Sequence, residues 1–544
     1  MVSDIDVAIE DAARAKAAGA DVVEFRVDPL AESLAPTPDT FAVVVGRLVG
    51  ASPLPAIVTC RITTEGGMYS GDDGSRAAWL RELLRYSAMP GKANAAPMYI
   101  DIEGARLAAS VELTGLAASL HATDTRVILS SHDFGGRPMD LSRRLLGVQD
   151  PRGSIAKVVY RARSLRDSLE ILDIPGHMDR PTIALGMGEF GLLTRVLAPK
   201  FGGFLTFASL AAGQGTAPGQ PTIDDLLNTY GFRSIGPETK VYGVIGWPVS
   251  HSKGPAFHNA GFREVGHDGV YLPLPIAASE SDLEATYASL KATLLDVIEH
   301  PRLNFRGASV TIPFKENLLR LAAEQRWGIS AHAQAAGAAN TIVVNGGGIS
   351  VDNTDWLGFA DPITRAAGNI RGKRVLVLGA GGAARTAAAW AWRAGALVSV
   401  ANRTRDRADR LKAEVENAVQ SGHGHESEAA GPCGELTVID WDQRESFDSD
   451  VVIHATSLGM SSGPSPDESP LSEKVLASFM PLIFETVYSP RETPLLRAAR
   501  AVGCPVIDGM QMFEAQAAAQ FEAWVGKPPP MEVCRGAVER CNGK

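Results

Sequence analysis

One lysine in the first half of the chain lies inside an apolar segment typical of a buried strand. Lys157 is preceded by Ile155 and Ala156 and followed by Val158 and Val159. A buried ammonium group is costly unless it is paired or used. Desolvation favours the neutral amine, which is a nucleophile and forms a Schiff base with a carbonyl substrate. The alternative is a structural lysine whose ammonium group pairs with a carboxylate at a strand end.

His132, within SSHDF (130–134), is the candidate acid or base to accompany this lysine. An unperturbed imidazole titrates near neutral pH, so it can take up and release protons. A buried structural histidine is the alternative. Further polar residues follow apolar segments, as active-site residues do at the carboxyl ends of barrel strands. They are Glu24, Arg26, Arg61, Glu65 and Arg195.

In the second half, Lys315 and Asp355 are the candidate acid–base pair. Three polar segments, at 246–259, 307–316 and 338–359, each follow an apolar strand. Lys315 lies in the second segment and Asp355 in the third. Hydride transfer from a secondary alcohol requires removal of the hydroxyl proton, which a lysine or a Lys–Asp pair can carry. A structural salt bridge is the alternative. The position of the pair beside a dinucleotide-binding motif favours catalysis.

That motif begins with an apolar strand at 375–378 that ends in Gly379-Ala380-Gly381-Gly382. An alanine-rich helix follows at once, starting with Ala383 and Ala384, and a second apolar strand covers 397–401. The glycines allow a tight turn, and the N-terminus of the helix faces a pyrophosphate. An acidic residue after the second strand would favour NAD. Arg403 and Arg405 stand there instead, which suits the 2′-phosphate of NADP.

The elements that position these residues are those of an α/β protein. Short apolar strands alternate with helix-length segments in the first half, which predicts a (β/α)8 barrel. The seven expected strands cover 22–26, 56–61, 98–102, 126–130, 154–160, 182–186 and 204–208. The chain begins with an expected helix at 3–18 and shows no first strand before it, so we expect either a truncated N-terminus or a barrel that is closed in another way.

Composition narrows the possible partners. The net charge of −10 gives no reason to expect nucleic acid or an anionic membrane as partner, and no apolar run reaches the roughly 18 residues that span a bilayer. The five cysteines are scattered without a C-x-x-C pair, which indicates reduced thiols and argues against structural zinc. The segment 421–435 contains two histidines but is typical of an exposed loop. We therefore expect small-molecule substrates, no metal and a monomeric chain.

The first half resembles type I 3-dehydroquinate dehydratase. The matching segments are EFRVD (24–28), TCRITTEGG (59–67), SSHDF (130–134), the Lys157 strand, GMGEFGLLTR (186–195) and TAPGQ (216–220). The resemblance implies that Lys157 forms an imine with the substrate ketone, that His132 transfers protons and that Glu65 orients His132. It also implies a set of residues that hold the substrate hydroxyls and carboxylate: Glu24, Arg26, Arg61, Arg195, Thr216 and Gln220. Thr216 stands where the family often has serine.

The second half resembles shikimate dehydrogenase, with further matches in GAGGAAR (379–385), ANRT (401–404), HATSLGM (454–460) and GMQMFEAQAAAQFEAWVG (509–526). The resemblance implies that Lys315 and Asp355 are catalytic. Substrate would be bound by Ser252, Gly254, Thr311, Asn340, Tyr488 and Gln516. NADP would be bound by the residues 379–384 named above, with Asn402, Arg403, Thr404, Thr456 and Gly509.

This half departs from the family at several positions. Gly254 replaces the second of two serines that bind the substrate carboxylate, which removes one donor and gives space beside the carboxylate-bearing carbon. Quinate carries an extra hydroxyl on that carbon, so a quinate or dual quinate/shikimate dehydrogenase with a weakened dehydratase half is the alternative function. Ser309 and His454 both replace asparagine, and Glu485 replaces aspartate. His454 is expected on the nicotinamide side of the site.

Together the two resemblances predict a bifunctional enzyme like those of plants and algae, which dehydrates 3-dehydroquinate and then reduces 3-dehydroshikimate with NADPH. The expected domains are a barrel at 1–232, a substrate-binding domain at 240–364 completed by 510–544, and an NADP-binding Rossmann domain at 365–509. The plant resemblance implies the plastid stroma, although no transit peptide is visible; otherwise the enzyme is expected in the cytoplasm.

Overall fold

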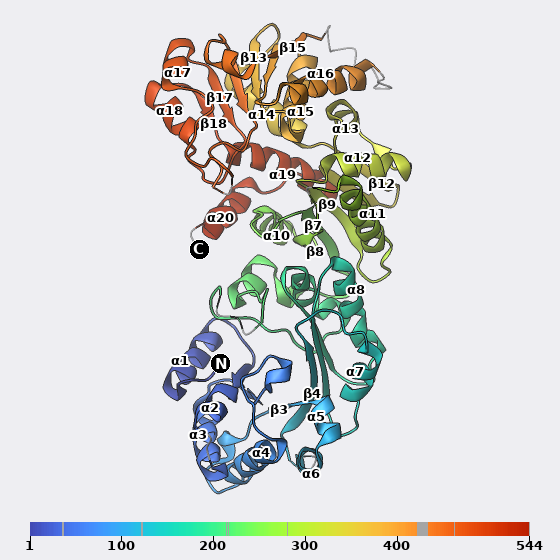
Figure 1. Cartoon of the computed structure of the whole chain (residues 1–544), viewed down its shortest axis with the longest axis vertical. Coiled ribbons are helices and arrows are strands. Elements are labelled where there is room, and N and C mark those ends of the chain that lie inside the picture. The colour runs from blue at the N-terminus through green and yellow to red at the C-terminus, as the bar shows by residue number, and fades with distance from the viewer. Residues whose placement is uncertain are drawn as a thin grey trace. The chain divides into compact units, whose positions relative to one another are not determined.

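The computed structural model describes residues 1–34, 37–120, 123–213, 215, 217–279, 281–420, 433–461 and 463–542. Thr216 and residues 421–432 of the expected exposed loop therefore lie outside the described residues. The chain forms two compact units. One comprises Met1–Lys240 with Asp268–Ile276 and Leu295–Asn304, and the other comprises Val241–His267, Ala277–Leu294 and Phe305–Lys544 (Figure 1).

Six parallel strands form the sheet of the first unit, in the order β1-β2-β3-β4-β5-β6. Because each strand pairs with the next in sequence, every connection crosses over through helical segments, as in a (β/α) barrel. The strands are β1 (Val23–Arg26), β2 (Ala56–Thr59), β3 (Tyr99–Glu103), β4 (Arg126–Asp133), β5 (Ile155–Arg161) and β6 (Thr182–Met187). The helices are α1 (Ile5–Ala17), α2 (Asp28–Leu34), α3 (Pro38–Ala51), α4 (Asp73–Ser87), α5 (Gly104–Ala109), α6 (Val111–Leu120), α7 (Leu141–Val148), α8 (Leu165–Asp173) and α9 (Leu192–Val196).

The seventh expected strand, at 204–208, is wrong: the structure has no strand there. The backbone N–H of Phe204 still donates to the carbonyl of Thr182 in β6 (2.8 Å), and Leu205 and Phe207 pack against the inner apolar cluster. The segment therefore runs beside β6 without forming a regular ladder. As expected, helix α1 is the first element of the chain; before it, the N–H of Val2 donates to the carbonyl of Arg26 at the end of β1 (2.8 Å).

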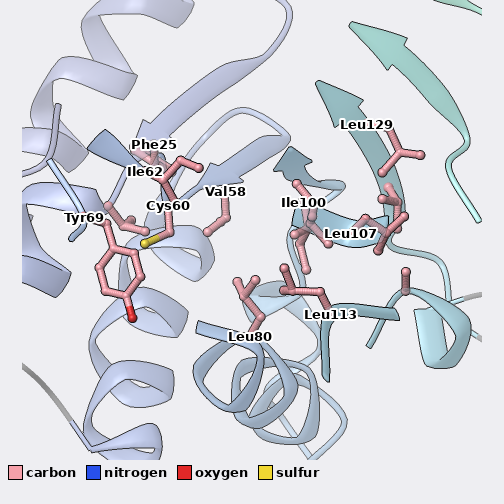
Figure 2. Packing of buried hydrophobic residues seen from close by; sticks show 14 of the residues in the cluster. Phe25, Val58, Cys60, Ile62, Tyr69, Leu80, Ile100, Leu107, Leu113 and Leu129 are labelled. Carbon is pink, nitrogen blue, oxygen red and sulfur yellow. The ribbon is translucent and has the colours of Figure 1, made fainter. Parts of the chain in front are cut away.

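Side chains alternate between the two faces of each strand, so the buried apolar residues of this sheet form two clusters, one on each face. Val58, Ile100 and Leu129 face the surrounding helices and pack with residues such as Leu80, Leu107 and Leu113 (Figure 2). Their strand neighbours Ile57, Tyr99 and Ile128 belong to the other cluster, with Ile155, Val159, Ile183, Leu185 and Met187. Side chains two positions apart on a strand share a face. Polar residues an even number of positions from members of this second cluster, on the same strand, therefore point to the inside of the barrel.

The second unit contains a parallel sheet in the order β15-β14-β13-β16-β17-β18. Its strands are β13 (Arg374–Leu378), β14 (Leu397–Ala401), β15 (Glu435–Ile439), β16 (Val451–His454), β17 (Leu482–Glu485) and β18 (Val506–Ile507). The two strands expected for the dinucleotide motif are confirmed as β13 and β14. After β15 the chain returns to the other side of β13, so the carboxyl ends of β13 and β16 flank a topological switch point, where ligands bind in such sheets.

A mixed sheet has the order β10-β12-β11-β9-β7-β8. Its strands are β7 (Lys240–Gly246), β8 (Gly269–Pro275), β9 (Phe305–Val310), β10 (Gly328–Ile329), β11 (Thr341–Asn345) and β12 (Gly348–Asp352). The remaining helices are α10 (Gly254–Glu264), α11 (Leu283–Glu299), α12 (Lys315–Glu324), α13 (Ala331–Ala336), α14 (Asp355–Ala367), α15 (Gly382–Arg393), α16 (Arg405–Gln420), α17 (Glu473–Phe479), α18 (Pro494–Val502), α19 (Gly509–Val525) and α20 (Met531–Asn542).

The end of the chain packs against the start of the second unit. Phe257 of α10 shares one apolar cluster with Phe513 and Ala517 of α19 and with Cys534 and Val538 of α20. Helix α19 begins with a capping box, in which Asp508 and Gln511 satisfy each other's backbone N–H groups. Among the helices of the described ranges, none is both long and apolar enough to cross a bilayer.

Candidate active sites

Lys157 lies on the inner face of the barrel, in step with Ile155 and Val159, and its side chain is 5% exposed. Its Nζ lies 3.0 Å from Oδ2 of Asp101 and 3.5 Å from Oε1 of Glu24. The ring of Phe207 lies under the ammonium group, with its centroid 4.5 Å from Nζ. Two carboxylates and an aromatic face all stabilise a positive charge at Nζ.

Asp101 is the centre of this arrangement. It accepts a hydrogen bond from the Ser130 hydroxyl (2.6 Å) and pairs with Nη2 of Arg61 (2.8 Å). Burial alone would raise the pKa of Asp101, but the charges of Arg61 and Lys157 outweigh burial and hold it well below its usual range. Asp101 is therefore an anion fixed beside Lys157.

The pairing continues outward as a chain of alternating charges. Arg61 reaches Oε1 of Glu103 (3.1 Å), and Oε2 of Glu103 accepts from Arg76 (2.6 Å). Arg76 pairs with Asp73 (2.9 Å), which also binds Arg106, a residue with a 45% exposed side chain. Every member between Lys157 and Arg106 is buried. The alternation compensates each buried charge on both sides.

His132, on the same inner face near the end of β4, pairs with Glu65 from the short turn Thr63–Glu65 that follows β2. One oxygen of Glu65, Oε2, accepts from the backbone N–H of His132 (2.9 Å) and lies 3.0 Å from its Nδ1. Burial, followed by the charges of Arg61 and Lys157, lowers the pKa of His132 well below its usual value. Burial and the charge of Glu103 raise the pKa of Glu65 to about 7. A neutral imidazole held at Nδ1 presents Nε2 as a proton acceptor.

Two arginines of this half differ in their partners. Arg26 forms a bidentate pair with Asp28 (2.7 and 2.9 Å). Arg195 is 2% exposed, forms no ion pair with any carboxylate of the described residues, and reaches only the carbonyl of Phe207 (3.4 Å). Burial lowers the pKa of Arg195 to about 10. A buried guanidinium without a carboxylate is costly, so this one is suited to bind an anionic ligand.

The second site places Lys315 against Asp355. Lys315 begins α12 and Asp355 begins α14, where the helix N-terminus stabilises its carboxylate. The Nζ of Lys315 donates to Oδ2 of Asp355, and Asn340 Nδ2 donates to Oδ1 (2.9 Å). The oxygen of Asn340 accepts from the N–H of Thr354 (2.8 Å), so its amide nitrogen points to Asp355 and to Oε1 of Gln516 (3.4 Å).

The other expected substrate residues lie on separate loops and helices. Oγ of Ser252 accepts from the N–H of Gly254 (3.2 Å) at the start of α10. The N–H of Thr311 donates to the carbonyl of Ile245 at the end of β7 (2.8 Å). The side chain of Tyr488 is 40% exposed.

A cavity of about 280 Å3 lies at the switch point of the parallel sheet. It is lined by Gly379, Ala380, Gly381, Asn402, Arg403, Arg407, Trp441, Ala455, Thr456 and Ser457. Gly379 has φ +121°, and a Cβ there would lie 2.5 Å from the carbonyl oxygen of Ala455, so only glycine allows this close approach. Gly382 opens α15, and its Cβ position lies 3.9 Å from Cδ of Lys315. The cavity therefore adjoins the Lys315–Asp355 pair.

The basic residues of this cavity differ from those expected. Arg403 lines it, but Arg405 turns to Asp440 (2.5 Å) and Asp409 (3.6 Å). Arg407 lines the cavity instead. Two guanidinium groups at the carboxyl end of β14 remain suited to a phosphate on the ribose.

Comparison with known proteins assigns both halves. Residues 1–237 match the model of type I 3-dehydroquinase, 244–342 match the shikimate dehydrogenase substrate binding domain, and 509–539 match the shikimate 5'-dehydrogenase C-terminal domain. A bifunctional 3-dehydroquinate dehydratase/shikimate dehydrogenase, chloroplastic, of Arabidopsis thaliana is 36% identical over 98% of this chain and 82% of its own length. The chain belongs to this bifunctional dehydratase/dehydrogenase family.

Two further relatives are similar over different shares of the chain. The pentafunctional AROM polypeptide of Schizosaccharomyces japonicus is 28% identical over 94% of this chain and 31% of its own length. A solved shikimate dehydrogenase in complex with NADP+ is 30% identical, covers 56% of this chain and 96% of its own, and has a TM-score of 0.45. The family joins a 3-dehydroquinate dehydratase to an NADP-dependent shikimate dehydrogenase. The comparisons do not favour the quinate dehydrogenase alternative.

The dehydratase half contains residues that sequence reasoning missed. Asp101, Glu103 and Ser130 contact Lys157 or Arg61, which were expected, and Arg76 pairs with Glu103. A signal for the two acids was available, since the apolar strand YIDIE places carboxylates at alternate positions, and hence on one face. In the dehydrogenase half, Thr341, Thr354 and Gln520 orient Asn340 and were also missed.

Proposed function

We propose that the first site dehydrates 3-dehydroquinate to 3-dehydroshikimate through a Schiff base at Lys157. The observation that carries this proposal is a buried lysine whose Nζ is 3.0 Å from the Asp101 carboxylate. Imine formation from the ketone releases water, and the protonated imine keeps the positive charge that Lys157 had. Asp101 and Glu24 therefore stabilise the intermediate as they stabilise the free ammonium group.

In this proposal the neutral imidazole of His132 transfers the protons. It removes a proton from the carbon next to the imine carbon and delivers a proton to the departing hydroxyl group. Glu65 holds the ring by its Nδ1 edge. Arg195 and Gln220 hold the substrate carboxylate, and Arg26 and Arg61 help to position the substrate.

Borohydride reduction tests the covalent step. With 3-dehydroquinate present, borohydride should convert the imine to a stable secondary amine, and peptide mass spectrometry should locate the added mass on Lys157. Protein treated with borohydride alone is the control. A label on another lysine would contradict the assignment.

Replacing Arg195 with methionine should change stability and substrate binding in opposite directions. The buried guanidinium lacks a carboxylate among the described residues, so an apolar side chain of similar length should raise Tm. The dehydratase KM should rise about 100-fold, because a charge-assisted contact to a carboxylate contributes roughly 3 kcal/mol. Thermal denaturation and initial rates measure the two effects, and Arg137→Met at an exposed ion pair is the matched control. A lower Tm would mean that Arg195 is structural.

We propose that the second site reduces 3-dehydroshikimate to shikimate with NADPH, with Lys315 and Asp355 handling the hydroxyl proton. The adjoining cavity at the glycine turn supports this placement, since the cofactor supplies the hydride when bound. Residues 379–384, Asn402, Arg403, Thr404, Thr456 and Gly509 are its proposed binding residues. Ser252, Gly254, Thr311, Asn340, Tyr488 and Gln516 are proposed for the substrate.

Gly254→Ser tests how this half recognises its substrate. The added hydroxyl should supply a donor to the carboxylate and raise kcat/KM for shikimate about fivefold, since a hydrogen bond contributes about 1 kcal/mol. It should also lower any rate with quinate, because it occupies the space beside the carboxylate-bearing carbon. Reduction of NADP+ with the two substrates side by side measures both. Unchanged rates would mean that Gly254 does not face the carboxylate.

The proposed domains are the dehydratase at 1–232, the substrate-binding domain at 240–364 with 510–544, and the NADP-binding domain at 365–509. The shared apolar cluster of α10, α19 and α20 supports joining the two segments of the substrate-binding domain. The proposed location is the plastid stroma, supported by the chloroplastic relative, and the proposed state is a monomer.

A further inference from the structure

A row of three polar side chains, Glu485, His454 and Thr456, leads to the cofactor cavity from inside the parallel sheet. His454 ends β16 and Glu485 ends β17, and the two are paired in the register of the sheet. Both side chains are completely buried. Nδ1 of His454 lies 2.9 and 3.0 Å from the two oxygens of Glu485, and Nε2 lies 2.6 Å from Oγ1 of Thr456. None of the three takes part in the proposed hydride and proton transfers.

The carboxylate of Glu485 is fixed from several sides. Its Oε1 accepts from the backbone N–H of Val487 (2.9 Å), and its Oε2 accepts from the hydroxyl of Thr493 (2.9 Å). Both oxygens of Glu485 accept from these donors, so an N–H at Nδ1 of His454 is the group that matches them. This contact fixes the orientation of the imidazole ring, and Nε2 is directed to Thr456.

Thr456 is the member of the row that reaches the cavity. It lines the cavity with Ala455 and the glycine turn. Its Oγ1 contacts Nε2 of His454 and also accepts from the backbone N–H of Leu458 (3.2 Å). Two neighbours therefore determine where the hydroxyl group points before a cofactor arrives, which lowers the entropy lost on binding.

We propose that His454 and Glu485 are a matched pair of positioning residues that fix the hydroxyl of Thr456 for NADP. The proposal rests on NADP occupying this cavity. The imidazole bridges from Glu485 to Thr456 through two nitrogens on opposite sides of a ring. Shortening Glu485 by one methylene withdraws its carboxylate by about 1.5 Å and leaves Nδ1 without its acceptor.

Four variants of the full chain test the pair: His454→Asn, Glu485→Asp, the double variant that combines both, and Thr456→Val. Fluorescence titration gives the Kd for NADPH, and steady-state rates give KM for NADP+ and for shikimate. Each single variant should raise Kd about tenfold, since a lost buried hydrogen bond costs a factor of this size. The KM for shikimate should stay within about twofold, because the row lies at the cofactor cavity. The double variant should bind NADPH no more weakly than the weaker of the two single variants, because both changes break the same row of contacts.

Thr456→Val combined with His454→Asn should bind NADPH no more weakly than Thr456→Val alone, because both changes remove the same contact. A KM for shikimate that stays within about twofold shows that the second unit of each variant has folded, because the dehydratase site lies in the other compact unit. Additive losses in either double variant, or equal changes in both KM values, would overturn the proposal. Absence of NADPH binding by the unaltered chain would instead overturn the cofactor assignment.

Discussion

Replacing Lys157 with alanine should lower the dehydratase rate by at least about 10,000-fold while the NADP-dependent oxidation of shikimate continues unchanged. Without the amine, the imine cannot form, and the remaining side chains can only bind the substrate. The two activities can be measured on one sample of purified chain. The dehydrogenase rate is thus an internal control for protein concentration, and thermal denaturation checks that the first unit has folded.

A second variant, Lys157→Arg, separates the effect of the positive charge from that of the nucleophilic amine. It keeps a positive charge near Asp101 and Glu24 but removes the nucleophilic amine. If only the charge mattered, Lys157→Arg would keep much of the activity that Lys157→Ala loses. We expect both variants to be inactive, and a dehydratase rate near that of the unaltered chain in either one would rule out the Schiff base.

Replacing Lys315 with alanine should have the reciprocal effect. We expect kcat of the dehydrogenase to fall by about 100- to 10,000-fold, since this is the usual contribution of a general acid or base. Dehydration should be unaffected, because the residues of that site lie in the other compact unit. Loss of both activities would mean that the assignment of the two sites to separate halves is wrong.

A second variant separates proton transfer from binding at this site. Asp355→Asn keeps one oxygen that can accept from either Asn340 or Lys315, but it removes the negative charge and places an amide NH2 group against the other donor. It should lower kcat with a smaller change in the KM for NADP+. Lys291→Ala, at an exposed ion pair with Glu324, is the matched control and should leave both constants unchanged.

Local patterns predicted most elements because short apolar runs specify buried strands. The expected strand at 397–401 has the bounds of β14, and β13 extends the expected strand by one residue. The segment at 204–208 has the same apolar alternation but no regular ladder, since pairing depends on neighbours that the local pattern does not encode.

The sequence alone predicted those site residues whose type is unusual for their local segment, but not the residues with which they pair. Lys157 was recognisable as a cation in an apolar strand, and Lys315 as part of a polar loop. Their partners, Asp101 for Lys157 and Asp355 for Lys315, depend on contacts across the fold. Arg405 pairs with Asp409 and with Asp440, which is 35 residues away, and this contact across the fold turns it from the cavity that Arg407 lines.

The alternating chain from Lys157 to Arg106 also constrains how this sequence can change over generations. Each inner member is shared by two neighbours of opposite sign, so a single substitution leaves two buried charges with one partner fewer each. Drift at Asp101, Glu103 or Arg76 therefore passes through an intermediate of low stability unless an adjacent position changes with it. Among descendants of a common ancestor, these positions should covary in adjacent pairs, whereas the exposed end at Arg106 should vary on its own.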